Sequence, residues 1–143
     1  MPHFTECMGE NVFTWACPDT AKELTFAIDR MPAWCVKTKQ EICLTPVMAL
    51  GARMFLQDRG IEAHRLERLT EECFNTPVIY CAMNGGTTHL LVDGHHRYVY
   101  AALTGRDAIP GYILTEPQWR KFLVTGIPTQ GADWLRTMFS GIK

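Results

Sequence analysis

The sequence predicts a mixed α+β fold, in which a small mixed sheet is flanked by helices. Three apolar runs of strand length support the sheet: Val78–Met83, Thr88–Asp93 and Ala108–Leu114. Residues Asn84–Thr87 are typical of a tight hairpin turn, because Asn and Gly tolerate positive φ. The segment His96–Thr104 has helical spacing and joins the last two runs, so we expect those two strands to be parallel neighbours.

Two helices are expected before the first of these strands. Thr45-Pro46 is a typical helix start, with Thr as N-cap and Pro in the first turn, and Pro46–Arg59 then ends at Gly60. A second helix is expected at Glu62–Phe74. The side chains spaced for burial are Val47, Leu50, Met54 and Leu56 on the first helix and Leu66, Leu69 and Cys73 on the second.

The two ends of the chain are less regular. Phe4–Ala16 and Leu24–Ile28 predict two strands, or one strand followed by an irregular arm. Pro32 disfavours helix at the residue before it, so Met31–Trp34 is expected in a loop, where Trp34 can pack in the core or stack on a base. Further helices are expected from Thr115 to about Val124 and around Trp134–Phe139.

The bulk composition is that of a globular protein. The chain has 143 residues, of which 47% are hydrophobic and 20% charged. Its 14 basic and 15 acidic side chains give a formal net charge of -1, which argues against a dedicated duplex-DNA binder. Only a local basic patch is compatible with this balance, and the C-terminal part offers Arg97, Arg106, Arg120, Lys121, Arg136 and Lys143.

The six cysteines show no CxxC spacing and no zinc-like pairing with a nearby His. Met1–Glu10 is polar, unlike a signal peptide, and no apolar run approaches the ~20 residues that span a bilayer. We therefore expect a cytoplasmic protein without membrane contact, whose cysteines are reduced and act as small apolar residues.

The strongest candidate site is Asp93-Gly94-His95-His96-Arg97, where an apolar strand runs into a helix. Backbone N–H groups in the first turn of a helix have no acceptor within the helix and lie at the positive end of its dipole. Gly94 allows close approach of a ligand, while the two histidines and Arg97 add donors. The pattern predicts an anion site that binds phosphates. The structural alternative makes Asp93 a helix cap, packs one histidine beneath the turn, and pairs Arg97 with Asp93 or Asp107.

The stretch LLVDGHHRYVYAALTGRDAIPGYIL, residues 90–114, resembles the core of the ParB/sulfiredoxin superfamily. That family has a strand ending in Gly-x-x-Arg, a helix with small residues, a glycine, and a strand that begins near Ile-Pro. Asn75–Met83 fits the same pattern, so the resemblance covers about residues 62–114. It implies one domain over residues 1–143 with this core and an extension at each end.

The resemblance implies ATP or CTP as the ligand, with the triphosphate on this turn and on the preceding helix. The residues expected to bind phosphate are Gly94, His95, His96 and Arg97, together with Arg65 or Arg68 of that helix. Asp93, His95 and His96 are the catalytic candidates, because histidine titrates near neutral pH and Asp93 can hold Mg²⁺ or orient a histidine. His64 and His89 are expected to be ordinary surface residues.

The motif departs from both well-known branches of the superfamily. Sulfiredoxins read Gly-Cys-His-Arg and use the cysteine for their chemistry, whereas this chain has His95, so sulfinic-acid repair by that route is not expected. ParB proteins read Gly-Glu-Arg-Arg, whereas here the acid is Asp93, before the glycine. The chain ends soon after Leu114, so the helix-turn-helix domain of a complete partition protein is not expected either.

Three functions remain open at this point. The first is an ATPase, nucleotidase or phosphotransferase that acts on a nucleotide with Mg²⁺. The second is a ParB-like nuclease or DNA-binding protein, in which His95 and His96 serve a phosphodiester. The third is a non-enzymatic accessory protein of a phage or plasmid that binds a nucleotide signal or a host protein.

Overall fold

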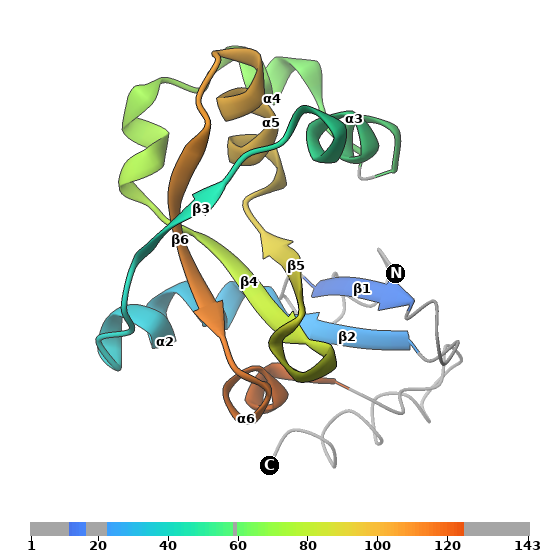
Figure 1. Ribbon diagram of the computed structural model, residues 1–143, viewed down its shortest axis with the longest axis vertical. Coiled ribbons are helices and arrows are strands. Elements are labelled where there is room, and N and C mark those ends of the chain that lie inside the picture. Colours follow the sequence, from blue (N-terminus) through green and yellow to red (C-terminus); the bar gives the residue numbers. More distant parts are fainter. Residues whose placement is uncertain (1–11, 17–22, 59, 125–143) are drawn as a thin grey trace. The chain divides into compact units, whose positions relative to one another are not determined.

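The computed structural model describes residues 12–16, 23–58 and 60–124. The chain divides into two compact units, one formed by residues 1–37 with 115–143 and the other by residues 38–114. Helices occur together with a two-stranded and a four-stranded sheet (Figure 1), which confirms the mixed α+β class. The expected core, residues 62–114, falls within the second unit. The helix expected around Trp134–Phe139 lies outside the described residues.

The second unit is built on the four-stranded sheet, whose order is β3-β6-β4-β5. Three of its strands have the predicted bounds: β4 (Val78–Met83), β5 (Thr88–Asp93) and β6 (Ala108–Leu114). β4 runs antiparallel to β5 and parallel to β6. The expectation that β5 and β6 are neighbours is wrong, because the hairpin places β4 beside β5 and β6 occupies the other edge of β4.

The hairpin between β4 and β5 forms as predicted. Its turn, η3 (Asn84–Gly86), has positive φ at all three residues: 51° at Asn84, 68° at Gly85 and 91° at Gly86. Asn and Gly adopt this region at low steric cost, so the local sequence determines where the chain reverses.

The fourth strand, β3 (Cys43–Pro46), occupies residues that the sequence assigned to a helix start. Thr45-Pro46 therefore ends an edge strand, which pairs antiparallel with β6, instead of capping a helix. The buried Thr45 hydroxyl donates to the Ile109 carbonyl oxygen at 2.9 Å. Pro46 lacks an N–H group, which an edge strand tolerates because one side of it has no neighbour in the sheet.

The first helix of this unit, α3 (Ala49–Asp58), begins later than expected and buries a different face. Leu50, Met54 and Leu56 were expected in the core, but they are exposed by 65%, 51% and 47%. Ala52 is buried instead, and Val47 and Phe55 pack partly against the core. Hydrophobic spacing failed because the buried residue of this helix is the small Ala52, whereas its large side chains Leu50, Met54 and Leu56 are exposed.

The single helix expected at Glu62–Phe74 is also wrong. The segment forms α4 (Ala63–Glu67) and a separate 3-10 helix, η2 (Glu71–Asn75). Thr70 between them is extended, with φ −131° and ψ 176°. Thr followed by two glutamates is itself typical of a helix start, so this boundary had a signal in the sequence. Leu66 and Cys73 pack against the core as expected.

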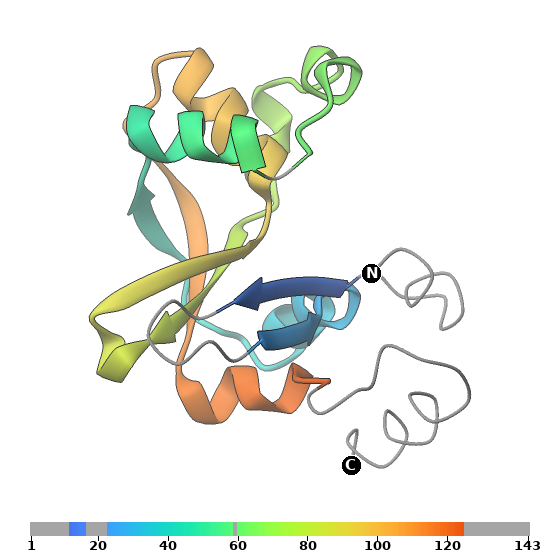
Figure 2. The same ribbon diagram turned by 90° about the vertical axis from the view of Figure 1, so that its right-hand side faces the viewer.

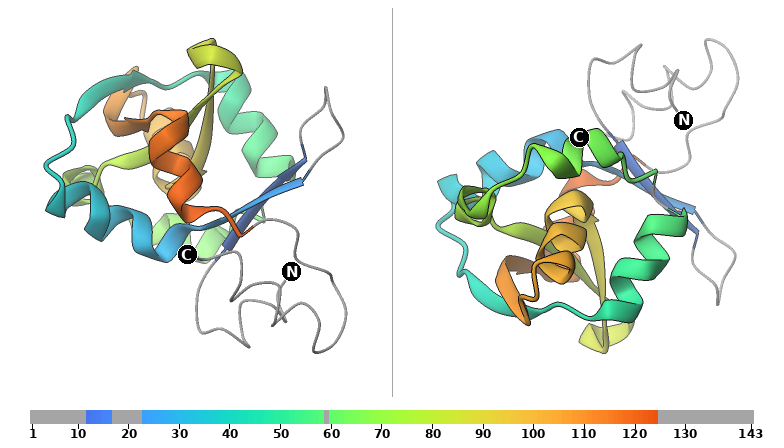
Figure 3. Two further views of the ribbon diagram at one scale, coloured as in Figure 1. Left: turned by 90° about the horizontal axis from the view of Figure 1, so that it is seen from below. Right: turned by 90° about the horizontal axis from the view of Figure 1, so that it is seen from above.

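The last helix of the unit, α5 (His95–Leu103), follows β5 directly. Figure 2 shows α3 and α5 side by side, and the view from above in Figure 3 shows α5 between α3 and α4. These helices gather where β5 ends and where β4 and β6 begin (Figure 1). The core cluster between sheet and helices consists of Ala52, Phe74, Val78, Tyr80, Leu91, Tyr98, Val99, Ala101 and Ile109.

In the first unit, β1 (Val12–Ala16) pairs antiparallel with β2 (Glu23–Ala27). The loop expected at Met31–Trp34 is wrong: η1 (Ile28–Arg30) continues into α2 (Met31–Lys37). Pro32 lies in the first turn of that helix, where its missing N–H group costs nothing. Trp34 accordingly packs edge-on against Phe122, with 5.5 Å between ring centroids, and is not a loop residue.

The helix expected from Thr115 to Val124 starts as predicted but is shorter. Thr115 and Gln118 form a capping box at the start of α6 (Glu116–Trp119), which is followed by the 3-10 helix η4 (Arg120–Phe122). None of the helices in the described part of the chain is long and apolar enough to cross a membrane.

Candidate anion-binding site

The turn between β5 and α5 is shaped by a bulge and a glycine. Ile79 pairs with Asp93 while the next residue, Tyr80, pairs with Leu91, so β5 holds one extra residue just before the turn. Gly94 then adopts the left-handed conformation, with φ 102° and ψ 26°, and is the N-cap of α5. Its carbonyl oxygen accepts the first helical hydrogen bond, from the Tyr98 N–H at 2.9 Å. The alternative in which Asp93 caps the helix is therefore wrong.

Space under the turn also requires glycine. A Cβ atom at position 94 would lie 2.4 Å from Cγ1 of Val78 and 2.9 Å from Nη2 of Arg97. Both distances are shorter than van der Waals contact, so the start of α5 packs directly on the first residue of β4.

The Arg97 side chain folds back against this packing. Its Nη2 donates to the Pro77 carbonyl oxygen at 3.4 Å and lies 3.5 Å from Oδ2 of Asp93. The side chains of Arg97 and Asp93 are only 20% and 26% exposed. The ion pair to Asp93 that the structural alternative suggested is thus present. Nε of Arg97 is buried and has no hydrogen-bond partner among the described residues.

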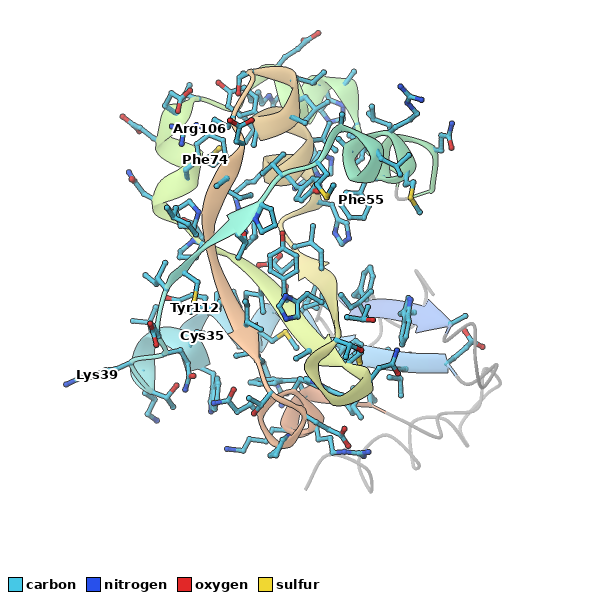
Figure 4. All side chains as sticks on the ribbon, in the orientation of Figure 1. Cys35, Lys39, Phe55, Phe74, Arg106 and Tyr112 are labelled. Carbon is cyan, nitrogen blue, oxygen red and sulfur yellow. The ribbon has the colours of Figure 1, made fainter. Side chains whose placement is uncertain are left out.

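His95 lies against α3. Its ring meets Phe55 edge-on, with 4.8 Å between centroids and an interplanar angle of 84°. Phe55, labelled in Figure 4, also meets the Tyr98 ring edge-on at 5.1 Å. The Tyr98 hydroxyl accepts a hydrogen bond from the Met48 N–H at 2.9 Å. Position 95 is therefore occupied by a half-buried imidazole supported by aromatic rings.

His96 points the other way, towards α4. Its Nε2 accepts a hydrogen bond from the backbone N–H of Glu62, the N-cap residue of α4, at 3.1 Å. A nitrogen that accepts carries no proton, which assigns the neutral form with the proton on Nδ1. Burial lowers the pKa of His96, and the positive charge of Arg65 lowers it further, against an opposing effect of Glu62.

The structure distinguishes between Arg65 and Arg68, the two arginines of the preceding helix that the sequence suggested as phosphate ligands. Arg65 acts on His96 electrostatically, and its Nη1 lies 3.8 Å from Oε1 of Glu62 with 56% of the side chain exposed. Arg68 is the exposed C-cap residue of α4, and its backbone N–H donates to the Arg65 carbonyl oxygen. Of the two, Arg65 is the one beside the turn.

Three residues that contact the turn were not identified from the sequence: Glu62, Phe55 and Pro77. Glu62 and Pro77 form their hydrogen bonds through backbone atoms, which every residue type has, so residue identity does not predict these contacts. Glu62 lies 34 residues from His96 in the sequence, and Pro77 lies 20 residues from Arg97. Phe55 is an ordinary apolar residue in a helix. None of the three has a signal that spacing or composition can detect.

The described residues do not build a metal site of their own. No group of three or more His, Cys, Asp or Glu side chains within residues 12–16, 23–58 and 60–124 can hold a metal ion. Asp93 already faces the guanidinium of Arg97, so it does not fit as the centre of a Mg²⁺ site formed by protein alone. Cys35, Cys43, Cys73 and Cys81 are not joined in disulfides, and Cys7 and Cys17 lie outside the described part.

The members of the predicted basic patch that the structure describes have local partners. Arg106 pairs with Glu71 and lies over the Phe74 ring, 4.2 Å from its centroid (Figure 4). In the first unit, Nη2 of Arg120 lies 2.7 Å from Oε2 of Glu116, and Nζ of Lys121 lies 5.1 Å from the centroid of the Trp34 ring. Arg136 and Lys143 lie outside the described residues.

His64 and His89 are exposed, as predicted, and Nε2 of His64 lies 3.2 Å from Oε2 of Glu62. The turn therefore brings together Asp93, Gly94 and Arg97 around Pro77, and His96 with Arg65 at the start of α4. No family model matches this chain, and neither a curated protein nor a solved structure matches it.

Proposed function

We propose that the protein binds the phosphates of a nucleotide at the turn Asp93–Arg97. The observation that carries the proposal is the left-handed Gly94 directly before α5, a helix of nine residues. In such a helix the N–H groups of His96 and Arg97 have no acceptor within the helix, and the helix dipole adds positive potential at the same end. An anion at this turn would meet several donors at once.

Side chains from two elements support the same ligand. Nδ1–H of His96 is a donor at the first turn of α5, and α4 carries Arg65, an exposed guanidinium whose charge acts on His96. Arg97 has a different part in the proposal, because its contacts with Asp93 and Pro77 hold the turn together. In this view Arg65 contacts phosphate, whereas Arg97 and Asp93 keep the donors in position.

The resemblance to the ParB/sulfiredoxin superfamily supports a nucleoside triphosphate such as ATP or CTP as the ligand. Mg²⁺ then enters with the phosphates, which supply most of its oxygen ligands, as is usual for this ion. Hydrolysis or phosphoryl transfer stays a prediction. Each catalytic candidate already has a neighbour that engages it: Arg97 for Asp93, Phe55 for His95 and the Glu62 N–H for His96.

Isothermal titration with ATP, CTP and GTP, with and without Mg²⁺, tests the proposal directly. We expect at least one nucleotide to bind, and Arg65→Ala to weaken that binding about tenfold through loss of one charge-assisted contact. Arg68→Ala is the matched control, since it removes the same charge three residues away and is expected to leave the affinity unchanged. If no nucleotide binds under any of these conditions, the proposal fails.

A further inference from the structure

The contact between Glu62 and His96 links two helices through one hydrogen bond of unusual type. The donor is a backbone N–H at the N-terminal end of α4, and the acceptor is a titratable ring nitrogen in the first turn of α5, 3.1 Å away. Most contacts between helices do not depend on the protonation of a side chain. This one requires Nε2 of His96 to be unprotonated, because two N–H groups facing each other cannot form a hydrogen bond.

The charged groups that face His96 come from α4. Arg65 opposes a positive charge on the imidazole, His64 acts weakly in the same direction, and Glu62 favours that charge. α3 also packs on α5, but its Arg53 is exposed. The effects of burial and of Arg65, which lower the pKa of His96, outweigh the effect of Glu62, which raises it. The pKa of His96 therefore lies below its usual value of 6.5.

From this geometry we infer that His96 is a pH-dependent contact that holds the start of α4 against α5 while the imidazole is neutral and releases it on protonation. α4 carries Arg65, the exposed cation beside the turn, so the contact also controls whether Arg65 faces the phosphate site. That consequence rests on the function proposed above. The contact itself belongs to the protein without ligand and can be tested without any nucleotide.

The direction of the pH effect follows from the pKa. Because folding lowers the pKa of His96, the unfolded chain binds more protons than the folded chain between the folded-state pKa and 6.5. The stabilisation from this contact is therefore complete above pH 6.5 and is lost as the pH falls through the folded-state pKa.

NMR of the ligand-free protein tests the contact in two ways. The ¹⁵N shifts of the His96 ring report its tautomer, and we expect the proton on Nδ1 at neutral pH. Hydrogen-exchange protection factors, which remove the intrinsic pH dependence of exchange, report the docking of α4. On acidification through the His96 titration we expect protection of the α4 amides to fall about fivefold, as for the loss of one neutral hydrogen bond.

His96→Gln separates the contact from general acid effects, since its side-chain oxygen can accept from the Glu62 N–H but does not titrate. We expect α4 protection in this variant to be independent of pH, whereas His64→Gln is expected to keep the pH dependence. A proton on Nε2 in the wild type at neutral pH overturns the inference, even where His96→Gln does not fold. So does a pH dependence that survives in His96→Gln. Neither outcome depends on nucleotide binding, which the titrations above measure.

Discussion

Gly94 determines the direction in which α5 leaves β5. Its φ of 102° belongs to the region that side chains rarely adopt, and the space where a Cβ would lie is filled by Val78 and Arg97. Gly105 has a similar backbone conformation, with φ 80°, but nothing lies within 4 Å of the position that a Cβ would take there. Substituting each glycine by alanine therefore distinguishes two destabilising effects. Both positions carry the strain of a left-handed backbone, but only position 94 adds steric crowding.

Gly94→Ala is expected to destabilise the protein by more than Gly105→Ala. Both variants bear the cost of a left-handed alanine, about 1–2 kcal/mol, and Gly94→Ala adds overpacking against Val78, about 1–3 kcal/mol. Urea denaturation of both variants against the wild type measures the difference. Equal losses would show that Val78 moves aside and that the turn is less tightly packed than its geometry indicates.

At this scale the sequence predicted the location of the turn but not the partners of its residues. An apolar strand followed by Asp93-Gly94 indicates a sharp turn into a helix because glycine is the residue that such a turn needs. The two adjacent histidines alone do not indicate that the His95 ring packs against Phe55 or that His96 accepts a hydrogen bond from the Glu62 N–H. Those contacts depend on where α3 and α4 lie, which is a property of the tertiary structure.

Among the elements of the second unit, three strands were predictable, whereas the edge strand β3 and the helices before β4 were not. β4, β5 and β6 are runs bounded by Pro, Asn, Thr, Gly or Asp, so local sequence sets both ends. α3 meets α5 through Phe55 and through the small Gly51, where a Cβ would lie 2.8 Å from the Tyr98 hydroxyl. Hydrophobic spacing searches for large apolar side chains and therefore selected the exposed face of α3.

The packing of α3 on α5 gives a prediction about Tyr98. Its hydroxyl accepts from the Met48 N–H just before α3, so Tyr98→Phe leaves that donor without its acceptor. We expect a loss of about 1 kcal/mol in the free energy of unfolding. Tyr100→Phe is the matched control, because the described contacts of Tyr100 involve its ring, against Phe74, and its backbone. A loss of the same size in both variants would contradict a specific role for the Tyr98 hydroxyl.

At the scale of the whole molecule, the charge balance helps to distinguish two expected classes of phosphate-containing ligand, nucleotides and nucleic acids. A net charge of -1 means that the chain has no general attraction for a polyanion. Several described cations outside the turn have acidic or aromatic neighbours, as Arg106 has Glu71 and Phe74. The site itself offers backbone N–H groups, one imidazole and the exposed Arg65, which suits a small phosphate ligand better than a long nucleic acid.

This difference predicts how binding responds to salt. A protein with 6–10 phosphate contacts on DNA loses about 10³–10⁵ in affinity between roughly 50 and 200 mM salt. With one exposed cation at the turn, we expect nucleotide affinity to fall only about fourfold over that range, because each contacting cation adds about one to the salt slope. Arg65→Ala should flatten even this dependence. Gel shifts with duplex and single-stranded DNA complete the comparison. A shift that persists near physiological salt, or a steep loss of nucleotide affinity, would favour the nucleic-acid function over the nucleotide site, because either requires a cationic surface larger than this turn.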